Sequence, residues 1–117
     1  MTLNEIKDIL QADALTSSFD MDMDIDKVCS TDLMSDVLAF SLPEVLLITG
    51  LVNKAVVYTA QIANVKAIVF VRGKKPNKET IALAEGKKIP LFVTKLSMFE
   101  ACGRLYMKRL RSSLDTR

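Results

Sequence analysis

The sequence contains no histidine and only two cysteines, and only four glycines and three prolines interrupt its 117 residues. The lack of histidine removes the commonest general base and metal ligand. It also excludes nucleophile systems of the Ser-His and Cys-His kind. Cys29 and Cys102 lie far apart and form no CxxC motif, so neither a zinc site nor a disulfide framework is supported. We expect two reduced, packed thiols and no metal site.

The common phosphate-binding loops are missing as well. Gly73-Lys74 has no upstream glycine at the spacing of GxxxxGK[ST], and GxGxxG does not occur. No apolar run approaches the roughly 20 residues that span a bilayer, and the polar start MTLNEIKD has no signal-peptide core. The sequence therefore predicts a cytoplasmic protein without a membrane segment or cofactor, and it offers no support for an enzyme.

The composition predicts one compact domain over residues 1–117, because half of the residues are apolar and the mean hydropathy is +0.23. The net charge of +2 hides a division. Residues 1–44 carry ten acids against two lysines, a charge of −8, whereas residues 45–117 carry fourteen basic residues against four acids, a charge of +10. This asymmetry fits attraction between the two parts, head-to-tail association, or a basic face for an anion.

The centre of the chain, residues 45–73, predicts a strand, a helix and a second strand. Residues 45–48 and 67–71 are unbroken apolar runs rich in β-branched side chains, which is typical of strands buried on both faces. Between them, one helix face is formed by Val52, Ala55, Val56, Thr59, Ile62 and Ala63. The two strands should be parallel. A third central strand is expected at 89–93.

Further helices flank this unit. A Thr2-x-x-Glu5 capping box predicts a helix to about Leu10, and a short strand is expected at 14–16. A helix over 31–40 should carry Asp32 in its first turn and bury Leu33, Met34, Val37 and Leu38. The resulting fold class is α/β, with three α/β/α layers around a mainly parallel, Rossmann-like sheet.

The second half continues the same alternation. Asn77 caps a helix that directs Ile81 and Ala84 inward and ends at Gly86. A capping box at 97–100 opens the last helix, with Gly103 at a close approach and an inner stripe of Phe99, Cys102, Leu105, Tyr106 and Leu110. Residues 111–117 are expected to fray.

The acidic segment 20–26 alternates aspartates with Met21, Met23 and Ile25. Its spacing resembles a calcium loop, but Ile25 stands where the loop needs glycine, and Thr31 stands where it needs a bidentate glutamate. The period of two residues instead predicts a half-buried edge segment with its carboxylates in water.

Polar residues follow each of the three central strands. In an open parallel sheet the ligand crevice lies beyond the carboxyl ends of the strands. A helix that begins there presents free backbone N–H groups and a positive dipole to an anion. The candidate ligand-binding residues are Thr49, Gly50, Asn53, Arg72, Gly73, Thr94 and Ser97, with Lys74 and Lys75 as neighbouring cations.

Five segments in this order and spacing together resemble DRTGG domains: 32–40, 47–51, 67–73, 90–94 and 97–106. The resemblance covers nearly all of the chain after about residue 20. It implies a small α/β domain similar to the amino-terminal domain of bacterial HPr kinase/phosphorylase, which acts as a regulatory or dimerising module. Where the eponymous Thr-Gly-Gly should fall, this chain has residues 26–28, Asp-Lys-Val. The kinase domain is missing, so kinase activity is not implied.

These observations favour a free-standing regulatory domain that binds a small anionic ligand, with an adenine nucleotide as the leading class. It would pass the signal on as a homodimer or through a protein partner. The alternative is an interaction or dimerisation subunit without a ligand. Nucleic-acid binding through Arg104, Lys108, Arg109 and Arg111 is disfavoured, because the chain lacks interleaved aromatics and a strongly basic total.

Overall fold

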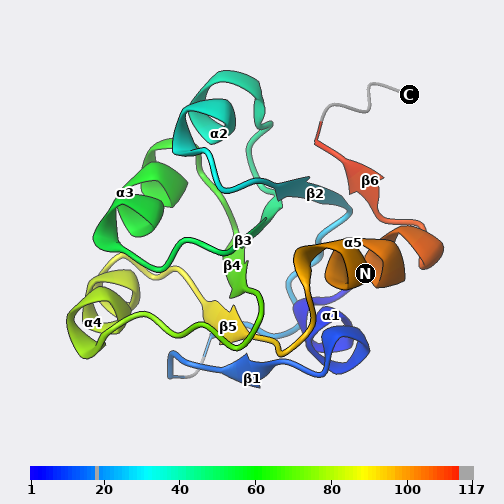
Figure 1. Ribbon diagram of the computed structural model, residues 1–117, viewed down its shortest axis with the longest axis horizontal. Helices are drawn as coiled ribbons and strands as arrows, with labels where there is room; N and C mark the ends of the chain where they lie inside the picture. The colour runs from blue at the N-terminus through cyan, green and yellow to red at the C-terminus, as the bar shows by residue number, and fades with distance from the viewer. Residues whose placement is uncertain (18, 114–117) are drawn as a thin grey trace.

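A computed structural model of the chain describes residues 1–17 and 19–113, and its centre is a six-stranded sheet in the order β1-β5-β4-β3-β2-β6 (Figure 1). All neighbouring strands are parallel except β1, which is antiparallel to β5. The strands are β1 (Asp13–Ala14), β2 (Lys27–Ser30), β3 (Leu46–Thr49), β4 (Ala67–Phe70), β5 (Leu91–Val93) and β6 (Arg111–Ser112). The predicted parallel pairing of β3 with β4 is confirmed.

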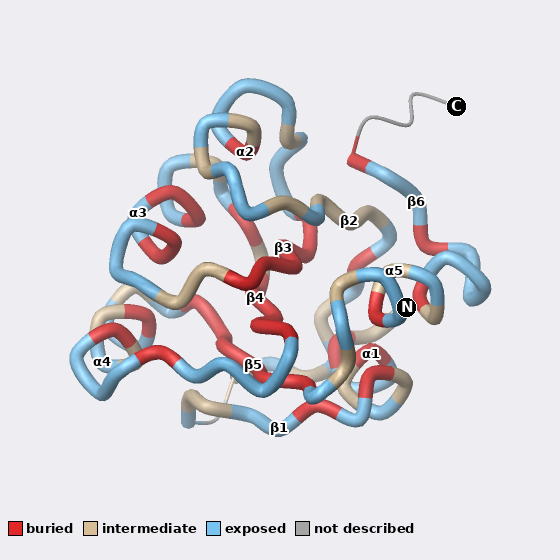
Figure 2. The backbone as a smooth tube through the Cα atoms, viewed as in Figure 1, coloured by how far each residue is buried: buried red, intermediate tan, exposed pale blue. Residues whose placement is uncertain are grey.

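Within residues 1–17 and 19–113, five helices cover the two faces of the sheet. They are α1 (Leu3–Leu10), α2 (Met34–Phe40), α3 (Lys54–Ile62), α4 (Lys78–Gly86) and α5 (Met98–Met107). One hydrophobic core lies under α2, α3 and α4, and the other lies under α1 and α5. Every residue of β3, β4 and β5 is buried, and the burial is concentrated there (Figure 2). The predicted three-layer α/β/α fold is confirmed.

The acidic segment packs against the start of α1, whose predicted capping box is present. The Thr2 hydroxyl accepts from the Glu5 N–H at 3.1 Å, and the Glu5 carboxylate accepts from the Thr2 N–H at 3.1 Å. The carbonyls of Met23 and Met21 accept from the next two N–H groups of the helix. The predicted alternation holds, since Ile25 is buried, the two methionines are half-buried and the acids are exposed. The segment forms only an isolated bridge at Thr2 and no regular strand within the described residues.

Two predicted helix faces are wrong in part. In α2 Val37 is buried, whereas Leu33 and Leu38 are 57% and 52% exposed. In α3 Ala55 and Ile62 are exposed, and Val57 and Ala60 are buried. The periodicity correctly predicted the helices, but the arc that it predicted to face the sheet is wrong in part. That arc depends on where the neighbouring helices lie, and α3 packs between α2 and α4.

The last helix and the tail also differ from expectation. Phe99 and Tyr106 are 90% and 76% exposed, because only a narrow arc of α5 around Leu105 lies against the sheet and α1. Gly103 is exposed and meets no heavy atom where a Cβ would stand, so the predicted close approach is wrong.

Residues 111–112, expected to fray, form β6, and the backbone N–H groups of Arg111 and Ser113 donate to the Asp26 and Val28 carbonyls at 3.0 and 2.9 Å. Residues 114–117, the remainder of the predicted frayed tail, lie outside the described residues. Across the described part of the chain, we find no helix with the length and apolarity that crossing a membrane requires.

Candidate functional site

The carboxyl ends of β2, β3, β4 and β5 lie along one edge of the sheet, because these four strands are parallel neighbours. The residues that follow them are therefore brought together from distant parts of the sequence. Of the seven predicted site residues, Thr49 ends β3, Asn53 and Ser97 are the N-cap residues of α3 and α5, and the others lie in the loops after β3, β4 and β5: Gly50, Arg72, Gly73 and Thr94. The strand ends differ in which polar groups they carry and in whether those groups are already hydrogen-bonded within the chain.

At the end of β3, the donor groups that were expected to bind an anionic ligand already form hydrogen bonds to a carboxylate of the chain. The backbone N–H of Gly50 donates to Asp32 Oδ1 at 2.7 Å, and the Thr49 hydroxyl donates to the same oxygen at 3.2 Å. Asp32 precedes α2 and does not lie in its first turn, so that prediction is wrong. Its carboxylate instead occupies the place that an anionic ligand was expected to take.

Arg72 approaches the same point from the end of β4. Around the position that a Cβ on Gly50 would take, the nearest heavy atoms are Arg72 Nη2 at 3.2 Å and the two Asp32 carboxylate oxygens at 3.3 and 3.4 Å. A side chain at position 50 would therefore make these neighbours shift by a few tenths of an ångström. The guanidinium and the carboxylate, which have opposite charges, thus lie on the same side of Gly50.

The loop after β4 is tied to the loop after β5 by its backbone. The N–H groups of Arg72 and Gly73 donate to the carbonyls of Leu96 and Thr94, each at 2.8 Å. Arg72 has a φ of +59° and Gly73 a φ of +68°, so the chain turns sharply through the left-handed region here. This turn leaves Gly73 exposed beside Thr94.

Three of the predicted side chains do not contribute a free donor group to a shared site. Two of them form hydrogen bonds within the fold, and the third forms no capping hydrogen bond. Thr94 is buried, and its hydroxyl donates to the Leu10 carbonyl at 2.7 Å and accepts from the Leu96 N–H at 3.2 Å. The Ser97 hydroxyl caps α5 by accepting from the Glu100 N–H at 3.2 Å. Asn53 is exposed at the start of α3, and its side chain makes no capping hydrogen bond.

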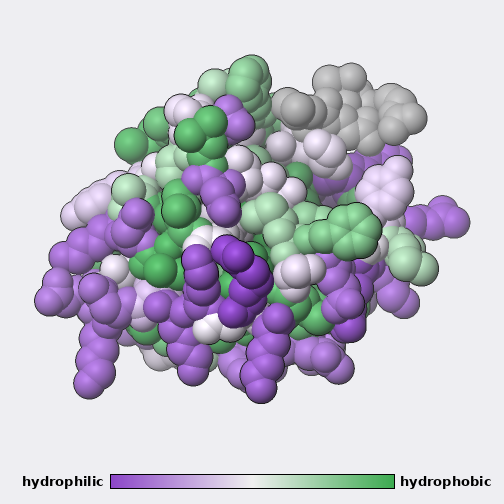
Figure 3. All heavy atoms as spheres, viewed as in Figure 1, coloured by the Kyte–Doolittle hydropathy of each residue, from purple (hydrophilic) through white to green (hydrophobic). Residues whose placement is uncertain are grey.

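An open hollow of about 520 Å³ lies at the ends of β4 and β5. Its rim carries Lys75 and Lys95, both exposed, together with the acid Asp13 of β1. Two predicted residues, Gly73 and Thr94, line it. Figure 3 shows hydrophilic side chains gathered over the loops that follow β4 and β5. Sequence reasoning missed Gln11, Asp13 and Lys95, although Lys95 directly follows a predicted strand end.

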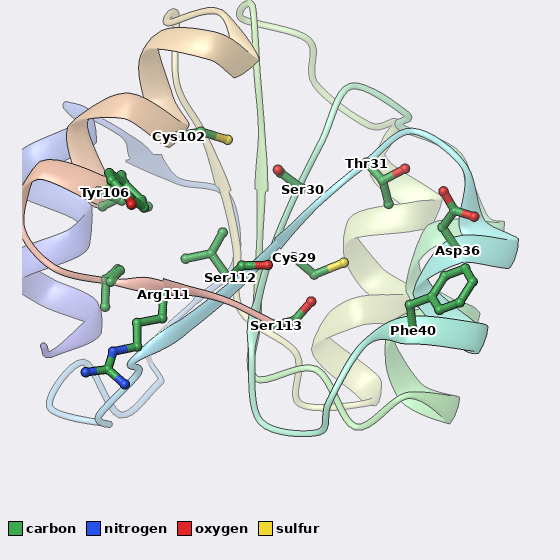
Figure 4. A pocket seen from close by; sticks show the side chains of 13 residues that line it. Cys29, Ser30, Thr31, Asp36, Phe40, Cys102, Tyr106, Arg111, Ser112 and Ser113 are labelled. Carbon is green, nitrogen blue, oxygen red and sulfur yellow. The ribbon is translucent and has the colours of Figure 1, made fainter. Parts of the chain in front are cut away.

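A second pocket, of about 310 Å³, lies near the opposite edge of the sheet, between β2, β6, α2 and α5 (Figure 4). None of the seven predicted site residues lines it, because it depends on β6, which the sequence did not predict. Cys29 and Cys102 both line this pocket and are free thiols. Burial raises the pKa of the Cys29 thiol, so this residue stays protonated at neutral pH. Within residues 1–17 and 19–113, no three His, Cys, Asp or Glu side chains are grouped as a metal site.

No protein-family model and no curated protein matches the chain. Among solved structures, the fold is similar to the CBS and DRTGG domains of the regulatory region of Clostridium perfringens pyrophosphatase, in complex with the activator diadenosine tetraphosphate. The TM-score is 0.71 at 23% sequence identity, over 93% of this chain and 47% of that chain. The chain therefore spans about half of that structure's length. At this identity the likeness shows the fold, which is DRTGG-like as the sequence resemblance implied.

Proposed function

We propose that this chain is a regulatory domain that binds a small anionic ligand, with an adenine nucleotide as the leading class, in the hollow at the ends of β4 and β5. The observation that carries the proposal is the placement of Lys75 and Lys95 on the rim of a 520 Å³ hollow at a parallel-sheet carboxyl edge. The volume falls within the range typical of small-molecule sites, about 300 to 1,000 Å³.

The charged side chains around the hollow favour the binding of an anion. Lys75 and Lys95 provide two ammonium groups at the rim, and Arg72 directly precedes Gly73, which lines the hollow. Asp13 opposes them from β1. A ligand with several phosphates satisfies more than one cation at once, and the similar pyrophosphatase region was crystallised with such an activator. The chain's own Asp32 already occupies the β3 end, so the ligand's charge is expected nearer β5.

The test is a thermal unfolding series with AMP, ATP, diadenosine tetraphosphate and inorganic phosphate. A ligand that binds only the folded state adds about 2.7 kcal/mol at 100 times its dissociation constant. We expect stabilisation by at least one nucleotide, and loss of that stabilisation when Lys75→Ala and Lys95→Ala are combined. Lys108→Ala, an exposed lysine beyond the hollow, is the matched control and should respond like the original chain. Absence of any nucleotide effect, or an equal effect in all variants, would contradict the proposal.

We further propose that the signal passes through contact with a second copy. Four large apolar side chains on and beside α2 are exposed: Leu33, Leu38, Phe40 and Leu42. Apolar surface gathered in this way marks interaction sites. Light scattering at micromolar concentration should give the dimer mass, and Leu38→Lys should give the monomer mass. A dimer that no nucleotide affects would instead support the alternative of a ligand-free interaction subunit.

A further inference from the structure

The most exposed large apolar side chains of the described part of the chain all lie on one helix, α5. Phe99, Met107 and Tyr106 are 90%, 83% and 76% exposed, more than any other large apolar side chain of residues 1–17 and 19–113. Apolar side chains gathered in this way mark an interaction surface. The helices α2 and α5 cover opposite faces of the sheet (Figure 1), so this surface is separate from the apolar side chains beside α2.

The outer face of α5 has a large side chain at each end and a notch between them. Phe99, Gly103 and Met107 are spaced by four residues, so they follow one another along this face. Ala101 and Leu105 form the buried arc on the other side of the helix. Gly103 is exposed, and a Cβ there would meet nothing within 4 Å beyond its own stretch of helix. The backbone of a second helix can therefore come close at the notch.

The symmetry of this face matches a second copy of itself. Phe99 and Met107 lie four residues before and four residues after Gly103. When two copies of α5 pack antiparallel, the two glycines face each other, and Phe99 of each copy lies opposite Met107 of the other. A thioether sulfur packs favourably against an aromatic ring. The same contact occurs twice, as an isologous interface between identical chains requires.

The charges beside this face set the orientation of the two helices. Glu100 and Arg104 lie along one flank of α5, where they form an ion pair at 3.5 Å within the helix. With a rise of 1.5 Å per residue, antiparallel packing about Gly103 brings Glu100 of one copy to within about 3 Å, along the helix axis, of Arg104 of the other. Parallel packing would instead place like charges at the same level. The charge pattern therefore complements a second copy in the antiparallel orientation.

We propose that α5 pairs with α5 of a second copy, antiparallel, about a two-fold axis that passes beside Gly103. Three large side chains per copy bury much less than the roughly 1,200 Å² of a stable interface, so the contact is weak and forms at high protein concentration. Together with the contact proposed for α2, it joins dimers into larger assemblies. The α5 contact needs neither the nucleotide nor the α2 contact, so its failure and theirs are distinguishable.

The first test is sedimentation equilibrium of the Leu38→Lys variant, in which the α2 contact is removed. The mass should rise from that of the monomer at about 10 micromolar towards that of the dimer at about 500 micromolar. Met107→Glu in this background should raise the dissociation constant at least roughly tenfold, which corresponds to about 1.4 kcal/mol. Ile62→Glu, on α3 and 74% exposed, is the matched control and should leave it unchanged.

Monomer mass at every concentration would overturn the proposal and assign the α5 face to a different protein or to none. Equal effects of Met107→Glu and Ile62→Glu would overturn it as well, because the association would then not depend on α5.

The second test is disulfide cross-linking, which reads the orientation directly. Gly103→Cys and Lys108→Cys, two exposed positions at α5, are each made together with Cys102→Ser. The two copies of position 103 face each other, whereas the two copies of position 108 lie about 15 Å apart along the axis. That separation is beyond the reach of a disulfide. Under mild oxidation Gly103→Cys should cross-link several-fold faster than Lys108→Cys, and equal rates would overturn the antiparallel pairing.

Discussion

The ends of β3 and β5 lie at the same edge of the sheet and differ in what fills them. At β3 the backbone N–H of Gly50 is bonded to the Asp32 carboxylate at 2.7 Å, so the chain provides its own anion. At β5 the loop opens onto a hollow with Lys75 and Lys95 on its rim. The comparison shows that hydrogen-bond donors at a strand end can bind an external anion only if the fold places no carboxylate of the chain there. The first end should therefore govern stability, and the second should govern ligand response.

The largest expected effect is that of Asp32→Ala at the filled end. It leaves the Gly50 N–H and the Thr49 hydroxyl without their acceptor, so the free energy of unfolding should fall by about 1 to 2 kcal/mol. If the carboxylate stands in for an anion, phosphate should restore more stability to this variant than it adds to the original chain. Chemical denaturation with and without phosphate measures both effects. Asp22→Ala, an exposed acid, is the control, and an equal phosphate response in both chains would contradict the idea.

Gly50→Ala should destabilise the protein by about 1 kcal/mol, because the new Cβ would press on the Asp32 oxygens at 3.3 and 3.4 Å. In an Asp32→Ala background the contacts with the carboxylate are gone, and the remaining close atom is Arg72 Nη2 at 3.2 Å, the end of a flexible side chain. The same substitution should then be neutral or stabilising by a few tenths of a kcal/mol, since alanine restricts the unfolded chain. A double-mutant cycle measures this coupling. If the two substitutions change the free energy of unfolding additively, Asp32 is not the reason that position 50 favours glycine.

At the open end Lys95→Ala should change the free energy of unfolding by less than about 0.5 kcal/mol, because the side chain is exposed. Its expected effect is on ligand response instead, with weaker stabilisation by nucleotides. Asp13→Asn should do the reverse, since it removes the opposing charge from the rim. Calorimetric titration of both variants with nucleotides measures these two opposite changes in ligand binding. A large loss of stability in Lys95→Ala would remove the distinction between the two ends.

The smallest effect is expected at Glu85, which lies away from both ends. The backbone N–H of Ser17 donates to its carboxylate and lowers the pKa of Glu85. A lowered pKa in the folded state adds stability above the unfolded value, and this stability is lost as the pH falls through the folded value. The stability of Glu85→Gln should therefore depend slightly less on pH below about 4.5. Denaturation curves from pH 3 to 7 measure the difference, and a steeper acid dependence in the variant would contradict it.

The sequence was most informative where burial is complete. Unbroken apolar runs predicted β3, β4 and β5, because a strand covered on both faces has no polar position. The caps at Thr2, Asn77 and Ser97 were also predictable, since each depends on residues no more than three apart. The candidate site was predictable as a place, the carboxyl edge of the sheet. Its contents were not, because Asp32 and Gly50 are 18 residues apart and meet only when β2 pairs with β3.

The amino-acid sequence by itself determined the helices, the central strands and their parallel orientation, since local spacing and hydrophobic burial dictate these features. Tertiary structure alone decided which arc of each helix is buried. It turned residues 111–112 into β6, left Phe99, Tyr106 and Leu38 exposed, filled one strand end with Asp32 and opened two pockets. The physical reason is that these outcomes depend on partners distant in the chain, and no pattern of neighbouring residues encodes the position of a partner that only folding brings near.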